Sequence, residues 1–379
     1  MAKKQEKQDA RAERLSKICA SINGGTFGGA GKDAVTWLGS RDVIQIERFS
    51  SGCVDIDDAL GGGYPKGRFI EIFGPESGGK TTATLHAVAE HQKKYPDEDC
   101  ALIDTEFSFD ESYAQRLGVN TKYLIVHQPE SGEQALNILK QLLQAGVTCI
   151  IVDSVAALTT KAELEGDIGD THVGEQARLM SQALKQLAAE AGKRSATVFW
   201  TNQIREKIGI SYGDKTTTPA GRALRHYASI RMHIRAIGKV KEKVGGEDVI
   251  VSSRNKIDVK KNKVAPPFKT AEFCITFGHG IDTIAAVLDS AISMKIVEKR
   301  GAWLAFAGEQ LGCGRAVSLE FLRKNPEVVE KITEAIVKAK DAGVQPVVAD
   351  DVEVMDPNAG ADPDAVGAAE EEGAEVADV

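Results

Sequence analysis

A glycine-rich turn between an apolar run and a helical run constrains this chain more than any other feature. It lies in "RFIEIFGPESGGKTTATLHAVAEHQKK", residues 68–94, and residues 74–81 match G-x-x-x-x-G-K-[ST] at every position. In such a loop, backbone N–H groups turn inward around phosphates, Lys80 reaches the β- and γ-phosphates, and the Thr81 hydroxyl is a ligand for Mg²⁺. The helix that follows points its positive end at the same anion. The sequence therefore predicts a site for ATP and Mg²⁺.

The residues that we expect to bind the nucleotide are the members of this loop and the threonine after it. They are Gly74, Pro75, Glu76, Ser77, Gly78, Gly79, Lys80, Thr81 and Thr82.

Strand-like and helical runs alternate on both sides of this loop. Strands are predicted over 68–74, 100–104, 123–127, 147–153 and 195–203, and helices over 80–94, 132–146 and 175–191. The run "VTCIIVD" is rich in β-branched residues and has no polar alternation, as expected for a strand buried on both faces. This alternation predicts an α/β fold with a mostly parallel central sheet covered by helices.

Changes in composition divide the chain into four parts. Residues 1–45 are predicted to form a helical arm and a glycine-rich linker, and residues 46–279 the ATPase core. Residues 280–345 are predicted to form a small C-terminal α/β domain. Residues 346–379 are acidic and poor in large apolar residues, and we expect them to be disordered.

Composition also indicates the compartment. No run of 18 apolar residues is present, and the charged start "MAKKQEKQDARAERLSKICA" lacks the apolar core of a secretory signal. The six cysteines are scattered without any C-x-x-C spacing, which favours reduced thiols. We therefore expect a cytoplasmic protein with no membrane partner.

Hydrolysis at a phosphate-binding loop needs further carboxylates. Asp153 closes the buried strand 147–153, where a second acid commonly supports Mg²⁺ beside Thr81. A carboxylate must also orient or deprotonate the attacking water. Asp104 and Glu106 both lie near the end of the strand over 100–104, and chemistry alone leaves the choice between them open.

Several blocks of this sequence resemble the RecA family of recombinases. They include "SGCVDIDDALGGGYPKGRF", "IIVDSVAALTTKAELEGDIGD", "TNQIREKIG" and "KNKVAPPFKTAEF", and the resemblance runs in order over residues 10–340. It implies an ATP-dependent recombinase that forms a helical filament on single-stranded DNA and exchanges strands with homologous double-stranded DNA. It also implies roles in recombinational repair and the SOS response, with a self-cleaving repressor as a further possible partner.

The resemblance assigns roles to residues around the nucleotide. The family's water-activating glutamate matches Glu106, which decides the choice left open above. The aspartate that contacts adenine and the tyrosine that stacks on it match Asp110 and Tyr113. The glutamine that senses the γ-phosphate matches Gln203.

Two lysines that the family places against the γ-phosphate of a neighbouring protomer match Lys261 and Lys263. Without the resemblance, this run would be interpreted as a solvated basic strand. His226 stands where phenylalanine is common in the family, at the boundary between subunits.

Two polar, glycine-punctuated segments match the family's DNA-binding loops, at about 165–174 and 204–221. We expect the second to have no regular structure of its own. Main-chain amides and arginines can grip phosphates without reading bases, and an aromatic side chain can stack on them. The alternative is a pair of plain surface connectors. The DNA-contacting residues that we expect are Arg178, Arg205, Tyr212, Gly221 and Arg222.

Two other functions fit a phosphate-binding loop on such a sheet. One is a motor or regulatory ATPase that closes into a ring and never binds DNA, and the other is a scaffold that does not hydrolyse ATP. Stimulation of ATP hydrolysis by single-stranded DNA would distinguish a recombinase from both.

The charge of the chain is concentrated at its C-terminal end. The formal net charge is −8, yet residues 349–379 hold eleven acidic residues and no Lys or Arg. Removing these eleven from the total of 55 leaves 44 acidic residues against 47 basic ones. A flexible segment of this length reaches roughly 30 Å, so it can compete with DNA phosphates for basic surfaces.

Removing residues 349–379 should therefore tighten binding to duplex DNA, most clearly at low Mg²⁺ where screening is weakest. The measurement is DNA binding of the full-length and truncated proteins across a salt and Mg²⁺ series, with ATP binding in the absence of DNA as the control. Identical DNA binding throughout the series would mean that the tail serves only solubility.

Overall fold

The computed structural model describes residues 2–23, 35, 37–38, 46–167, 174–206, 216–219, 221–244 and 247–342. The chain divides into two compact units, residues 1–47 and 48–379. The described part of the first unit is mainly helix α1 (Ala2–Asn23). In this unit the side-chain amide of Asn23 exchanges two hydrogen bonds of 2.8 Å with the backbone of Val35.

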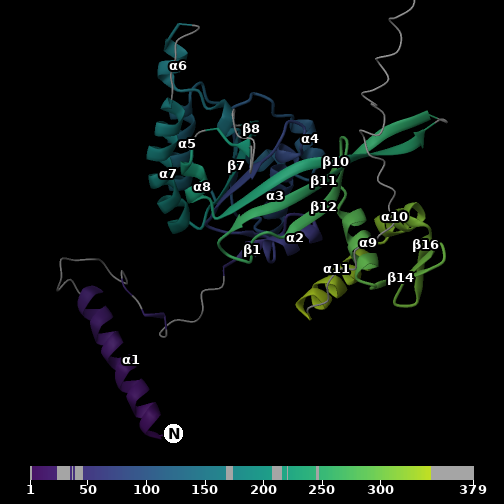
Figure 1. Ribbon diagram of the computed structural model, residues 1–379, viewed down its shortest axis with the longest axis horizontal. Coiled ribbons are helices and arrows are strands. Elements are labelled where there is room, and N and C mark those ends of the chain that lie inside the picture. The colour runs from purple at the N-terminus through teal and green to yellow at the C-terminus, as the bar shows by residue number, and fades with distance from the viewer. Residues whose placement is uncertain are drawn as a thin grey trace, which may run out of the picture. The chain divides into compact units, whose positions relative to one another are not determined.

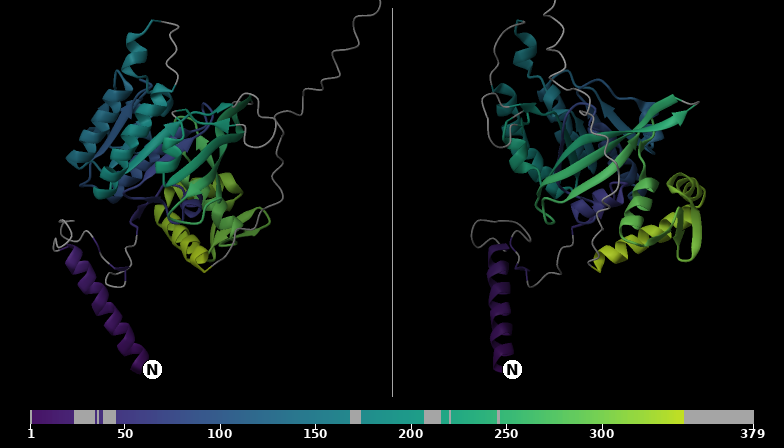
Figure 2. Two further views of the ribbon diagram at one scale, coloured as in Figure 1. Left: turned by 60° about the vertical axis from the view of Figure 1, so that its left-hand side comes forward. Right: turned by 45° about the vertical axis from the view of Figure 1, so that its right-hand side comes forward.

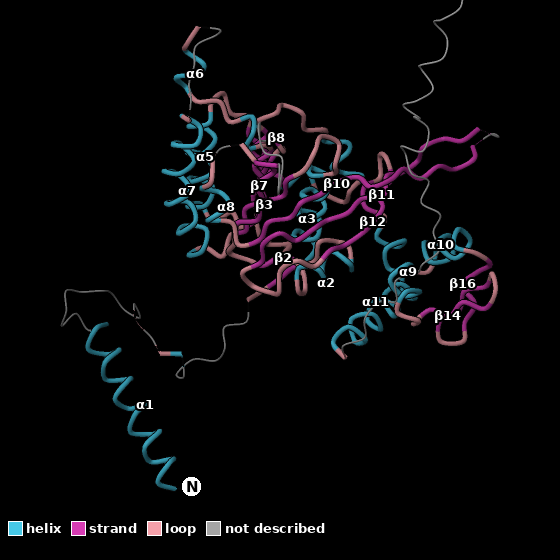
Figure 3. Tube along the Cα trace, viewed as in Figure 1, coloured by secondary structure: helices cyan, strands magenta, loops and turns pink. Residues whose placement is uncertain are grey.

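The second unit is built on a nine-stranded sheet (Figures 1 and 3). The strand order is β13-β12-β11-β10-β3-β7-β6-β4-β5, and five of the eight neighbouring pairings are parallel. The predicted mostly parallel sheet is thus confirmed. The parallel strands are β3 (Phe69–Phe73), β4 (Cys100–Asp104), β5 (Leu124–His127), β6 (Cys149–Asp153) and β7 (Thr197–Asn202), and β10 (Ile230–Val244) joins them through β3.

Helices cover both faces of the sheet (Figures 1 and 2). One face packs on α2 (Val54–Leu60), α3 (Lys80–Lys94) and α4 (Glu111–Arg116). The other packs on α5 (Gly132–Ala145), α7 (Glu175–Lys193) and α8 (Ala223–Tyr227). The helix predicted over 175–191 is confirmed as α7, and its residues Met180, Leu184 and Leu187 are buried against the sheet. All five residues of β3, β4 and β6 are buried, which explains their lack of polar alternation.

Short elements connect these layers. They are β1 (Arg48–Phe49), β2 (Tyr64–Pro65), the 3₁₀ turns Thr121–Tyr123 and Val155–Ala157, and α6 (Lys161–Glu165). Strands β8 (Arg205–Glu206) and β9 (Thr216–Thr217) pair with each other. The expectation that 204–221 has no regular structure is therefore wrong at its two ends.

An antiparallel extension of the sheet was not predicted. Strand β10 turns back into β11 (Glu247–Asn262), followed by β12 (Thr270–Thr276) and β13 (Gly280–Ile281). The first two strands have 15 and 16 residues, and Figure 1 shows them running beyond the body of the sheet. Their charged, irregular sequence gives little strand signal, because much of their length is not covered by helices.

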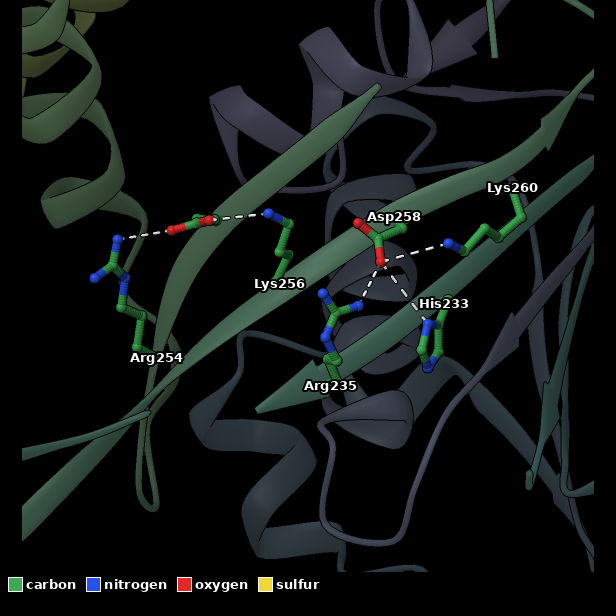
Figure 4. A network of polar contacts seen from close by, with 7 residues as sticks. His233, Arg235, Arg254, Lys256, Asp258 and Lys260 are labelled. Carbon is green, nitrogen blue, oxygen red and sulfur yellow. Dashed lines mark hydrogen bonds and ion pairs between the residues drawn. The ribbon is translucent and has the colours of Figure 1, made fainter. Parts of the chain in front are cut away.

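These outer strands carry a network of shared ion pairs (Figure 4). Asp258 lies against Arg235 and within 3.7 Å of Lys260, and His233 approaches it to 3.8 Å. Glu272 is shared in the same way between Arg254 and Lys256, at 2.7 and 3.3 Å. Two carboxylates thus form ion pairs with four Lys and Arg side chains, so the charges of this network sum to a positive value.

The C-terminal part of the second unit has a core of its own. It consists of α9 (Thr283–Ser293), the antiparallel strands β14 (Val297–Arg300), β15 (Trp303–Phe306) and β16 (Glu309–Cys313), and the helices α10 (Arg315–Lys324) and α11 (Pro326–Asp341). Lys340 on α11 lies 3.6 Å from Asp55 on α2, which ties this part to the core. Among the described residues, no helix has the length and apolarity to cross a bilayer.

A buried ion pair lies at the centre of the sheet. Glu71 on β3 is fully buried, and its carboxylate accepts hydrogen bonds from Arg231 on β10 and, at 3.2 Å, from Asn202 on β7. The Arg231 guanidinium also lies over the Phe73 ring, 4.5 Å from its centroid. Removing one partner of such a pair leaves an uncompensated buried charge.

We expect Arg231→Met to lower the free energy of unfolding by about 3–5 kcal/mol, because the Glu71 carboxylate would be buried without a cation. The double variant Glu71→Gln, Arg231→Met should lose less than Arg231→Met alone, since the glutamine can still accept from Asn202. Chemical denaturation of the single and double variants measures this. A double variant less stable than Arg231→Met would contradict the interpretation.

Candidate functional site

The site lies at the edge of the sheet where the parallel strands end. The phosphate-binding loop follows β3, Asp153 ends β6, Glu106 comes two residues after β4, and Gln203 follows β7. These four strands are neighbours in the order β3-β7-β6-β4. Because parallel strands present their carboxyl ends at one edge, residues far apart in the sequence meet there.

The loop over 74–79 follows the sheet closely because glycines stand where it approaches the neighbouring strands. A Cβ on Gly74 would lie 2.0 Å from the Ile234 carbonyl oxygen, and one on Gly79 would lie 2.4 Å from Ile275 Cδ1. Ser77 and Gly79 have φ of 55° and 91°, which is the left-handed backbone that turns N–H groups inward. Asn255 on β11 donates to the Gly78 carbonyl at 3.1 Å and fixes the loop from below.

A cavity of about 590 Å³ opens above this loop. Its lining includes most of the predicted nucleotide set together with Glu106, Tyr113, Asp153 and Gln203. The remaining lining residues are Ser253, Ile275, Phe277 and Gly278, from β11, β12 and the turn after them. The volume suits a small ligand such as a nucleotide.

The lysine of the loop is poised at the cavity. Lys80 Nζ donates to the carbonyl oxygens of Gly74 at 3.2 Å and Pro75 at 2.8 Å. Burial lowers the pKa of Lys80 from its ordinary value, while Asp153, Glu106 and Glu76 oppose that shift. These carbonyl contacts are weak enough to exchange for phosphate oxygens, which bind an ammonium more strongly.

Thr81 and Asp153 form a hydroxyl–carboxylate pair. Thr81 donates to Asp153 Oδ2 at 2.7 Å, and Thr201 donates to Oδ1. Burial raises the pKa of Asp153, and the two hydroxyl donors only partly offset this. A bound divalent cation would stabilise the carboxylate, and these hard oxygen atoms are the ligand type that Mg²⁺ requires.

The two candidate carboxylates after β4 have different environments. Asp104 is buried and accepts hydrogen bonds from Glu106 N, Phe109 N and Gln128 Nε2 at 3.0–3.2 Å, so it holds the turn together. Glu106 is exposed to the cavity, where Ser154 donates to it at 2.5 Å and Gln203 Nε2 lies 3.5 Å away. This arrangement favours Glu106 as the group that meets water.

The two residues expected to contact adenine, Asp110 and Tyr113, differ in their position relative to the cavity. Tyr113 lines the cavity, and its hydroxyl lies 2.8 Å from Thr82 Oγ1. Asp110 is not among the described lining residues; it caps α4 instead, accepting from Tyr113 N at 3.0 Å and Ser112 Oγ at 2.7 Å. These hydrogen bonds lower the pKa of Asp110, and the one from Ser112 has the largest effect.

Lys261 and Lys263 lie outside the cavity of their own chain. Lys261 Nζ donates to the carbonyls of Arg225 and His226 at 2.5 and 3.1 Å, and Lys263 Nζ to that of His226 at 3.3 Å. Both ammonium groups thus bind the C-terminal end of α8. The pKa of Lys261 is lowered to about 8, mainly by burial and then by the positive charges of Lys263 and Arg231.

Of the predicted DNA-contacting residues, Arg178 lies on α7, Gly221 and Arg222 come just before α8, and Arg205 lies on β8. Arg178, Arg205, Gly221 and Arg222 are all exposed. Gly221 has φ of 74°, and a Cβ there would lie 2.9 Å from Ala177 Cβ, so this end of the second loop packs closely on α7. Tyr212 lies outside the described residues, as do 168–173 and 207–215 within the two loops.

Four residues that position the site were not predicted from the sequence. Ser154 holds Glu106, Thr201 holds Asp153, Asn255 holds Gly78, and Asn202 links Glu71 to Gln203. Ser154 and Asn202 adjoin Asp153 and Gln203, and Thr201 lies two residues before Gln203, which is the signal that could have found them. Asn255 gave none, because it comes from the unpredicted strand β11.

Comparison with known proteins gives a consistent assignment. The family model of the RecA N-terminal domain matches residues 24–282, and the family model of the RecA C-terminal domain matches residues 285–341. The chain is 48% identical over 309 residues to protein RecA of Rhodospirillum rubrum, which covers 81% of this chain and 83% of that protein. It is 50% identical over 309 residues to protein RecA of Campylobacter jejuni, with 81% and 88% covered.

Protein RecA of Clostridium botulinum is similar to the same extent, at 49% identity over 308 residues, 81% of this chain and 85% of that protein. The fold and the site therefore define an ATPase with a phosphate-binding loop on a mostly parallel sheet. The chain belongs to the RecA family. It is a DNA-dependent ATPase and a recombinase of DNA recombination and repair.

Glu106→Gln should lower the turnover of ATP by two or more orders of magnitude, the scale of losing a general base, while nucleotide binding is retained. Steady-state hydrolysis and equilibrium binding of a fluorescent ATP analogue measure the two effects separately. Lys80→Ala should lose both. Normal turnover by Glu106→Gln would reject the assignment and turn attention to Asp104.

Proposed function

We propose that the chain binds ATP with Mg²⁺ in this cavity, assembles as a helical filament on single-stranded DNA, and there pairs and exchanges homologous strands. The observation that carries the proposal is the meeting of Lys80, Thr81, Asp153, Glu106 and Gln203 around one cavity at the carboxyl edge of the sheet. Mg²⁺ would be held by Thr81 and Asp153 and would neutralise charge on the phosphate oxygens.

Each residue has a distinct task in this proposal. The inward-turned N–H groups of 74–79 and Lys80 bind the phosphates. Ser154 orients the Glu106 carboxylate, which accepts a proton from the attacking water. Gln203 lies beside Glu106 and opens the second loop, so a contact between Gln203 and the γ-phosphate would reach the DNA-binding segment directly.

The DNA contacts in this proposal are made with phosphates. Arg178 at the start of α7, Arg205 on β8 and Arg222 at the start of α8 are exposed cations on elements that flank the two loops. Such contacts suit a protein that binds any sequence. Single-stranded and double-stranded DNA are the proposed partners, and the proposed compartment is the cytoplasm. A self-cleaving SOS repressor is a further proposed partner of the filament.

The direct test of this function is ATP hydrolysis with and without single-stranded DNA, together with electron microscopy in the presence of an ATP analogue. Hydrolysis stimulated by DNA and helical filaments are expected. Arg205→Ala and Arg222→Ala should reduce the stimulation but leave ATP binding unchanged. Equal hydrolysis in both conditions, with closed rings in the micrographs, would favour a regulatory ATPase instead.

Lys261 and Lys263 should act on the ATP of a neighbouring protomer. Both lie outside the cavity of their own chain, and their present partners are carbonyl groups, which bind an ammonium more weakly than a γ-phosphate does. Contact across protomers would stabilise the ATP-bound assembly over the ADP-bound one.

Mixing two inactive proteins tests this. Lys80→Ala lacks the phosphate-binding lysine, and Lys261→Ala, Lys263→Ala lacks the lysines offered to the neighbour. Combined, they should recover part of the DNA-dependent hydrolysis, because some interfaces join an intact cavity to intact lysines. Absence of recovery at every mixing ratio would count against action between protomers. The control is each variant assayed alone at the same total protein concentration.

A further inference from the structure

A second cluster of reactive side chains lies at the opposite end of the same strands. A ring nitrogen of His91, Cys100 Sγ and Cys149 Sγ all lie within 4.8 Å of one another, and the three residues are fully buried. Cys100 opens β4 and Cys149 opens β6, whereas the nucleotide cavity lies where these strands end. The cluster is therefore separate from the site described above and has no part in its chemistry.

The fold brings the three residues together from separate parts of the chain. Cys100 and Cys149 face each other directly in the parallel pairing of β4 with β6. His91 lies in the last turn of α3, which packs on this face of the sheet. Neither spacing nor a C-x-x-C pattern reveals the group, because the two cysteines are 49 positions apart and only the strand register joins them.

The distances fit a tetrahedral metal ion. His91 Nδ1 lies 3.5 Å from Cys100 Sγ. Two ligands at ordinary Zn–S and Zn–N lengths, on a tetrahedral centre, are about 3.5 Å apart. The widest gap in the cluster is at most 4.8 Å, so small side-chain rotations bring all three atoms to bonding distance.

The other nitrogen of His91 has the environment of a metal-bound histidine. Nε2 is buried without a hydrogen bond, yet it lies 3.3 Å from Glu98 Oε2. Glu98 is itself held by Lys66 at 2.5 Å and by Thr148 at 2.7 Å. A carboxylate behind the far nitrogen fixes the tautomer and raises the basicity of a metal-binding imidazole.

The ion pair of Glu98 with Lys66 lies on the Nε2 side of His91. Glu98 is 28% exposed, whereas the Lys66 side chain is 8% exposed, so this ion pair separates the cluster from solvent. Opening it would admit an ion without unfolding the strands. Once bound, an ion with two thiolates would link β4, β6 and α3.

We propose that His91, Cys100 and Cys149 bind a thiophilic d¹⁰ metal ion, Zn²⁺ or Cu⁺, in the core; these three protein ligands would leave the fourth position of a tetrahedral Zn²⁺ to another donor. Two thiolates and one imidazole are the soft ligands that select these ions over Mg²⁺. Zn²⁺ would give a neutral site with two thiolates, which suits burial. Each thiol that is still protonated releases its proton to solvent as its sulfur binds the metal.

Cobalt substitution of the full-length, reduced, metal-free protein tests the proposal. One equivalent of Co²⁺ should produce a thiolate-to-metal charge-transfer band in the near ultraviolet, and Zn²⁺ should abolish the band by displacement. Saturating Mg²⁺ occupies the nucleotide site throughout. Titration with Cu⁺ in a separate arm, against a chromophoric Cu⁺ chelator, distinguishes the two ions. Bound Zn²⁺ or Cu⁺ should also raise the thermal midpoint by several degrees.

Variants then locate the site. Cys149→Val replaces the thiol by a somewhat larger apolar side chain of high strand propensity between apolar residues of β6, so it should fold and lose the band. His91→Gln should weaken metal binding at least tenfold. The matched control is Cys19→Ser, Cys313→Ser, which removes two thiols outside the cluster and should keep the band.

Far-ultraviolet circular dichroism and DNA-dependent ATP hydrolysis establish that each variant is folded. A band in the parent protein that is lost in Cys149→Val and kept in the control supports the proposal. No band in the parent protein, or a band that survives in Cys149→Val, would overturn it.

Discussion

The close approach of the phosphate-binding loop to strand β10 is the contact on which the site depends. The loop can lie this low only because Gly74 has no Cβ, which would otherwise meet the Ile234 carbonyl oxygen at 2.0 Å. Gly79 meets the same restriction from Ile275 on β12. The outer, antiparallel half of the sheet therefore forms the floor of the nucleotide cavity, and Asn255 ties that floor to Gly78. Strands β10, β11 and β12, although long and charged, thus support the phosphate-binding loop directly.

A buried polar chain runs from this cavity across the sheet. Gln203 N donates to Asn202 Oδ1 at 3.0 Å, Asn202 donates to Glu71, and Arg231 closes the chain on the other side of Glu71. Arg231 is the strand partner of Lys261, whose ammonium binds the end of α8. Every link lies on a strand or at its end. The chain of contacts thus joins the residue after β7 to the strand pair that carries Lys261.

The two ends of the parallel strands have opposite chemistry. At the carboxyl ends the chain leaves the sheet in turns, so polar groups can reach a charged ligand and solvent. At the amino ends β4 and β6 begin inside the core, and two thiols and an imidazole are enclosed there. The same register that aligns Asp104 with Asp153 aligns Cys100 with Cys149. One pairing of strands thus supports two unrelated groups of side chains.

Much of this protein follows from its sequence alone. The loop over 74–81, the buried strands and the helix 80–94 are local patterns, because each depends on neighbouring residues and on hydrophobic periodicity. Only the tertiary structure revealed the antiparallel strands β10 and β11, whose stability comes from pairing with each other and not from a local signal. It also showed the different environments of Asp104 and Glu106, which the family resemblance had already told apart but residue spacing could not, because burial and hydrogen-bond partners depend on the folded chain. The group of His91, Cys100 and Cys149 was decided in the same way, since strand register is a long-range property that no local pattern specifies.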